Sequence, residues 1–150
     1  MGRTLDMALL STQEMCKPDF TFSSRKHETG LEFDELSNRV IAAAIQVHKG
    51  LGPGFLESIY EQALAIELGK RGIKFEAQKE VAVHYDGRIV GKHVLDVLVE
   101  GELIVELKAV KALEDVHFAQ LRSYLRATGI KVGLLMNFAE ATLRIKRMVN

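Results

Sequence analysis

The stretch formed by residues 94–109, VLDVLVEGELIVELKA, constrains the fold more than any other part of this 150-residue chain. Two apolar runs rich in valine, leucine and isoleucine flank a Glu-Gly-Glu turn, which is the pattern of a β-hairpin. The runs nevertheless carry Asp96 in the first strand and Glu106 and Lys108 in the second. Burying ionised groups is costly unless they are paired or bind a metal, so these charges indicate a function.

The composition predicts one domain with a sizeable hydrophobic core, since 47% of the residues are hydrophobic. The 20 basic and 20 acidic residues cancel, so overall charge does not indicate a strongly basic nucleic-acid-binding protein. From residue 116 onward, however, six basic residues stand against one acid. These candidates for contact with a nucleic-acid backbone are Arg122, Arg126, Lys131, Arg144, Lys146 and Arg147.

Cysteine usage and hydropathy point to a cytoplasmic protein. Cys16 is the only cysteine, which excludes an intrachain disulfide and fits a reducing compartment. Every apolar run is much shorter than the roughly 18 residues of a membrane-spanning helix, and the N-terminus does not resemble a signal peptide. We therefore expect no membrane segment.

The first half of the chain is predicted to form a flexible arm over residues 1–30, followed by two helices that begin a single domain over residues 31–150. Apolar residues at helical spacing predict the helices over about 34–48, with Asp34 at the start, and about 55–71. The glycine-rich segment between them predicts a tight reversal. A phosphate-binding loop is disfavoured, because the segment follows a helix and lacks the terminal Lys-Ser/Thr.

Glu57 lies on the predicted buried face of the second helix, whereas Glu61 and Glu67 are predicted to face water. The other residues predicted on that buried face are Leu56, Ile59, Tyr60, Ala63, Leu64 and Leu68.

The remainder of the chain predicts three antiparallel strands, a helix and two further strands. Asp86-Gly87 is a two-residue hairpin signal, and Gly129 is a helix stop. The predicted ranges are strands 78–85, 88–99 and 103–109, helix 114–128, and strands 130–136 and 143–149. The order α-α-β-β-β-α-β-β predicts an α/β (α+β) fold with a central mixed sheet flanked by helices.

Asp96, nine intervening residues, then Glu106 and Lys108 form a spacing suited to metal chemistry. Two carboxylates on neighbouring strands can share one Mg²⁺ ion, and a lysine two residues further lies on the same strand face. The register decides whether this site exists. A two-residue turn would place Asp96 and Glu106 on opposite faces, so the site requires a three-residue turn or a bulge.

The chain resembles the PD-(D/E)XK nuclease superfamily in four ordered elements: a helix with Glu57, then Asp96, Glu106-Leu107-Lys108, and a helix with Gln120 and Tyr124. More narrowly, Gly54-x-x-Glu57-x-x-Tyr60 followed by LIVELKA and LLMNF is similar to the bacterial GxxExxY proteins. The proline of the superfamily motif is replaced by Leu95.

The resemblance implies a restriction-endonuclease-like core and a nuclease that uses Mg²⁺ or Mn²⁺, with DNA a better substrate than RNA. Asp96, Glu106, the Leu107 carbonyl and Glu57 would hold the metal. Lys108 would assist the attacking water, and Gln120 and Tyr124 would line the cleft and steady Lys108 or the substrate.

A second hypothesis is a non-catalytic module of the same fold that binds nucleic acid or assembles into a homo-oligomer. The zero net charge and the lack of a separate DNA-reading domain favour it. A third is a purely structural ion triad of Asp96, Glu106 and Lys108, which adds little net stability. Binding that is independent of Asp96 and of metal would distinguish the second hypothesis from the first.

Overall fold

A computed structural model describes residues 31–150, so the predicted N-terminal arm lies outside the described residues. Within this range the order of elements is α-α-β-β-β-α-β-β, which confirms the predicted order and the α+β class. The elements are α2 (Leu31–Leu51), α3 (Glu57–Lys70), β1 (Phe75–Tyr85), β2 (Arg88–Val99), β3 (Leu103–Lys108), α4 (Asp115–Thr128), β4 (Val132–Asn137) and β5 (Arg144–Val149).

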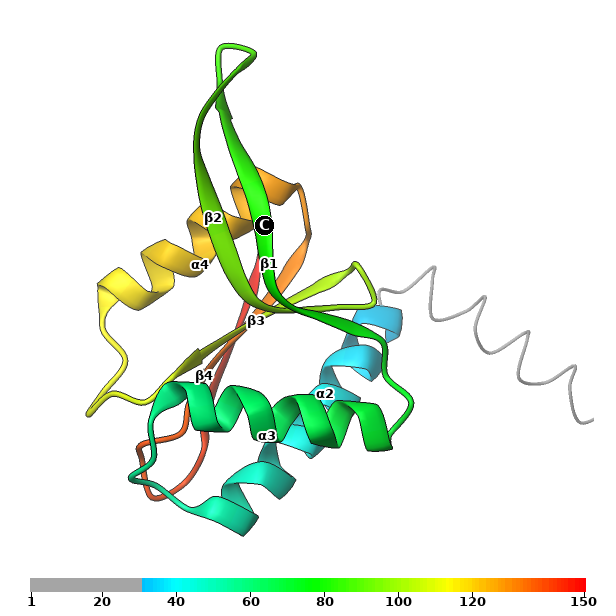
Figure 1. Cartoon of the computed structure of the whole chain (residues 1–150), viewed down its shortest axis with the longest axis vertical. Coiled ribbons are helices and arrows are strands. Elements are labelled where there is room, and N and C mark those ends of the chain that lie inside the picture. Colours follow the sequence, from blue (N-terminus) through cyan, green and yellow to red (C-terminus); the bar gives the residue numbers. More distant parts are fainter. Residues whose placement is uncertain (1–30) are drawn as a thin grey trace, which may run out of the picture. The chain divides into compact units, whose positions relative to one another are not determined.

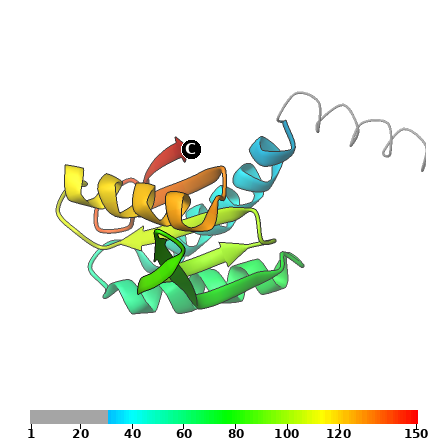
Figure 2. The same ribbon diagram turned by 90° about the horizontal axis from the view of Figure 1, so that it is seen from above.

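The five strands form one mixed sheet in the order β1-β2-β3-β4-β5 (Figure 1). Strands β3 and β4 are parallel, and the other neighbours are antiparallel. Helices α3 and α4 lie on opposite sides of the sheet (Figure 2). The central strand β3 is therefore covered on both faces, which explains why it is apolar apart from its functional end.

The core is continuous from α4 to the sheet, and residues 37–150 form one compact unit. The buried cluster on this side contains Leu95, Leu98, Ile104, Leu121, Tyr124, Leu125 and Leu135. Gly129 adopts φ 73° after α4, which confirms it as the helix stop. None of the helices within residues 31–150 has the length and apolar character required to cross a membrane.

The two N-terminal helices differ from the prediction in their limits and in the face that is buried. Helix α2 begins at Leu31, so Asp34 lies inside it. Leu56 precedes α3 in an extended conformation and is 72% exposed, and Ile59 is 40% exposed. Their predicted burial is wrong, because the buried face of α3 follows Tyr60, Leu64 and Leu68.

Candidate metal centre

The hairpin between β2 and β3 has the register that a shared metal site requires. Val99 pairs with Leu103 across a three-residue turn, and Val97 pairs with Val105. Continuing this register by one residue places Asp96 opposite Glu106, on the same face. The predicted three-residue turn is confirmed.

Asp96 is further fixed by the main chain of the neighbouring strand. The Leu107 N–H donates a hydrogen bond to Asp96 Oδ2 over 2.9 Å. Burial raises the pKa of Asp96, while this hydrogen bond and the charge of Lys108 act in the opposite direction. The carboxylate is thus held at one position beside the end of β3.

Lys108 links Glu106 on β3 to a polar pair on α4. Its Nζ lies 3.3 Å from Glu106 Oε1 and donates to Gln120 Oε1 over 2.7 Å. Gln120 Nε2 in turn donates to Tyr124 Oη over 2.7 Å. The two helix residues therefore hold the ammonium group in place, at the spacing of one helical turn. The Tyr124 ring also packs against His93, with centroids 4.7 Å apart.

Glu106 is more deeply buried than Asp96. It is 2% exposed, and its Oε2 has no hydrogen-bond partner among the described residues. Burial first, and then the charge of Asp96, raise the pKa of Glu106 to about 8, with Lys108 opposing the shift. A buried acceptor without a partner costs free energy, so this oxygen calls for a ligand.

Two carboxylates of α3 complete the cluster. Glu57, Glu61 and Asp96 each offer an oxygen atom, and these atoms lie within 4.8 Å of one another. The prediction that Glu61 faces water is wrong: it is half-buried, since it lies four residues after Glu57 on the same helix face. That spacing was the sequence signal for it.

The pKa values of both helix carboxyl groups rise in this environment. Burial is the largest cause for Glu57, and its carboxylate also accepts a hydrogen bond from the Ala109 main chain, which opposes the rise in pKa. Burial, followed by the charge of Asp96, raises the pKa of Glu61 to about 7. The cluster therefore concentrates carboxyl groups, and Lys108, together with His117 near Glu57, partly balances their charge.

Tyr60, which is buried as predicted and belongs to the Gly54-x-x-Glu57-x-x-Tyr60 motif, fixes the loop that precedes α3. Its hydroxyl donates to the Gly52 carbonyl over 2.6 Å and accepts from the Phe55 N–H over 3.2 Å. Its ring stacks on Phe138, with centroids 4.6 Å apart. The Phe138 N–H bonds the Lys108 carbonyl over 2.8 Å. The N-terminus of α3 is thereby connected to the end of β3.

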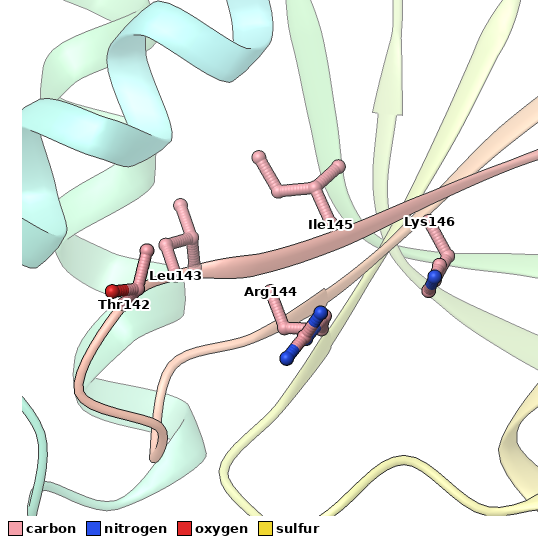
Figure 3. Close-up of a pocket in the computed structure, with 5 residues that line it drawn as sticks. All are labelled: Thr142, Leu143, Arg144, Ile145 and Lys146. Atoms are coloured by element: carbon pink, nitrogen blue, oxygen red, sulfur yellow. The ribbon is translucent and has the colours of Figure 1, made fainter.

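The six basic residues proposed to contact nucleic acid are all exposed. Arg144 Nε lies 3.4 Å from Glu140 Oε1. Arg144 and Lys146 line a hollow beside the edge strand β5, together with Thr142, Leu143 and Ile145 (Figure 3). This hollow shares no lining residue with the carboxylate cluster.

A family model described as the PD-(D/E)XK nuclease superfamily matches residues 34–148. No curated protein matches the chain. A similar solved structure, titled "Crystal structure of SSO0001", is 19% identical with a TM-score of 0.49 and covers 62% of this chain. The match covers 49% of that structure, so this chain spans about half its length.

Proposed function

The chain belongs to the PD-(D/E)XK nuclease superfamily, and we propose that it is a divalent-metal-dependent nuclease that hydrolyses phosphodiester bonds in DNA. The observation that carries the proposal is the group of carboxylate oxygens from Glu57, Glu61 and Asp96 within 4.8 Å of one another. Within the superfamily, the positions of Gly54, Glu57 and Tyr60 support membership of the GxxExxY proteins. The single cysteine supports action in the cytoplasm.

The residues present fit Mg²⁺ or Mn²⁺. The donors are carboxylate oxygens, which hard divalent cations prefer, and the unpartnered Glu106 Oε2 is an acceptor that a cation would satisfy. Asp96 and Glu57, whose oxygen atoms lie within 4.8 Å of each other, would hold the ion. We propose Glu106 and the Leu107 carbonyl as further ligands on the neighbouring strand. A bound ion supplies charge stabilisation to the phosphate and lowers the pKa of water.

Lys108 is the residue proposed to act on the reacting groups. Gln120 and Glu106 hold its ammonium at the edge of the cluster, so it can donate hydrogen bonds to the attacking water or to a phosphate oxygen. Tyr124 limits the rotation of the Gln120 amide by accepting one of its hydrogens. The reacting lysine is thereby positioned before substrate binds.

The exposed basic side chains support a nucleic-acid substrate. Lysine and arginine attract the phosphate backbone without regard to sequence, and this attraction weakens as the salt concentration rises. We propose Arg122, Arg126, Lys131, Arg144, Lys146 and Arg147 as the contacts, with RNA as the second substrate to assay.

A cleavage assay tests the proposal. Single- and double-stranded DNA and RNA are incubated with the protein in Mg²⁺, Mn²⁺ or EDTA. We expect metal-dependent cleavage that is lost in Glu106→Ala and Lys108→Ala but retained in Glu102→Ala and Lys111→Ala, whose side chains are exposed nearby. Binding of nucleic acid without metal-dependent cleavage would favour the non-catalytic module instead.

A further inference from the structure

Of the two cluster carboxylates on α3, Glu61 has a side-chain hydrogen-bond partner on another element, which fixes its orientation. Gln78 Nε2 donates a hydrogen bond to Glu61 Oε2 over 2.8 Å. The Glu61 carboxyl group also interacts directly with that of Asp96. Glu61 is therefore held against the cluster from β1, although it belongs to α3.

Gln78 occupies an unusual position in the sheet. In the β1–β2 ladder, Ala77 pairs with Val97 and Lys79 pairs with Leu95, so Gln78 stands beside Asp96 where the regular pairing is interrupted. Its φ of 52° lies in the left-handed region, which is unfavourable for a residue with a side chain. This local backbone conformation places the amide of Gln78 at the carboxylate of Glu61.

An independent observation shows that the cluster is built to receive a ligand. Glu106 is only 2% exposed, and its Oε2 has no hydrogen-bond partner among the described residues. The register of β2 and β3 places Glu106 opposite Asp96, beside the cluster, and its charge interacts with those of Asp96 and Glu57. A polar atom this deeply buried requires a partner, and four neighbouring carboxylates select a cation.

We propose that Glu61 is a direct metal ligand, so that Glu57, Glu61 and Asp96 hold the divalent cation between α3 and β2. Gln78 is the positioning residue that orients Glu61. The inference rests on the proposed function in needing a bound divalent cation, but it extends the ligand set from the D-x₉-E-x-K pattern to a position one helical turn after Glu57.

Calorimetric titration of the full chain with Mn²⁺ tests the assignment without relying on activity. We expect Glu61→Gln to lower the Mn²⁺ affinity at least about tenfold, since even partners outside the coordination shell change metal affinity about 10- to 100-fold. Gln78→Ala should lower it less. Glu67→Gln is the matched control on the same helix, because Glu67 pairs with Lys70 and Arg71, and it should bind as the wild type does.

A second variant separates coordination from general electrostatics. Glu61→Asp keeps the charge but withdraws the oxygen atoms by one methylene, so a direct ligand predicts weaker Mn²⁺ binding here too. Thermal melts in EDTA establish that each variant is folded. Wild-type affinity in Glu61→Asp together with weakened binding in Glu61→Gln would overturn direct ligation and assign Glu61 a charge effect only.

Two further results keep this inference distinct from the proposed function. If Glu61→Gln binds Mn²⁺ as the wild type does while Glu57→Gln and Asp96→Asn lose binding, Glu61 is not a ligand and the nuclease proposal stands. If the wild type itself binds no Mn²⁺, both proposals are overturned.

Discussion

Replacing Glu106 by glutamine should stabilise the metal-free protein at pH 8 and remove much of its pH dependence. The pKa of Glu106 is about 8 in the fold, whereas its ordinary value is 4.5. Between these values the folded state binds the proton more tightly than the unfolded chain does. The free energy of unfolding therefore falls as pH rises across this window, and Glu106→Gln removes the titrating group.

The size of the effect follows from the same values. Each pH unit between 4.5 and 8 lowers the free energy of unfolding by about 1.4 kcal/mol, so holding Glu106 protonated in the fold costs about 3 kcal/mol by pH 7. Because Asp96 titrates with it, this is an upper figure. The value of about 8 already includes the opposing charge of Lys108, so the expected gain at pH 7 is at most about 3 kcal/mol, equivalent to about 6–12 °C in Tm for a chain of this size.

Thermal melts followed by circular dichroism at pH 5, 6, 7 and 8 in EDTA measure this effect. The wild type should melt at progressively lower temperature as pH rises, while Glu106→Gln changes less and exceeds it at pH 8. Glu102→Gln, in the exposed hairpin turn, is the control and should follow the wild type. A wild-type Tm that is constant or rises from pH 5 to 8, or a less stable Glu106→Gln at pH 8, would refute the reasoning.

Adding Mn²⁺ should narrow the stability gap between the two proteins, which connects stability to the proposed site. A ligand at 100 times its Kd stabilises a fold by about 2.7 kcal/mol. The wild type should gain about this much at pH 8, whereas Glu106→Gln should gain less because it has lost a carboxylate. Equal gains in both proteins would exclude Glu106 from the metal site.

Three substitutions test other parts of the structure. Lys108→Met should abolish cleavage without lowering the Mn²⁺ affinity measured by calorimetry, because Lys108 repels a cation; weaker binding would assign it a structural role. Tyr60→Phe loses the hydroxyl bond to Gly52, so denaturant unfolding should show a loss of about 1 kcal/mol, and unchanged stability would contradict this. Gly133→Ala would place a Cβ 2.8 Å from the Leu121 side chain and should cost about 1–3 kcal/mol in the same denaturant unfolding; unchanged stability would contradict the clash.

Most of the fold could be predicted because its signals are local. Asp86 and Gly87 adopt φ values of 49° and 73° in the two-residue turn that their residue types indicate. The alternation of strands and helices likewise depends on hydrophobic periodicity within short segments. The register at Asp96 could be stated as a condition, since only one turn length brings it to the face of Glu106.

The missed parts of the site depend on contacts between segments far apart in sequence. The apolar pattern placed Glu57 on the buried face of α3 together with Leu56 and Ile59. Leu56 and Ile59 are exposed, and Glu61, which was predicted to face water, lies beside Glu57 in the cluster. This orientation of α3 follows from Tyr60, which fixes the preceding loop and stacks on Phe138. Periodicity cannot predict this choice, because it contains no information on where a helix meets a distant strand.

The position of β3 explains how the fold tolerates a charged cluster. Its first half is apolar and buried. The charged residues Glu106 and Lys108 stand in its second half, beside the end of the parallel strand β4. Asn137, at the same end of β4, donates to the Val110 carbonyl and accepts from its N–H. The segment after Lys108 is therefore fixed on both sides, which favours a site assembled in advance of its cation. The cost of about 3 kcal/mol at Glu106 is a large share of the roughly 5–15 kcal/mol by which whole domains are typically stable, so the cluster requires such a scaffold.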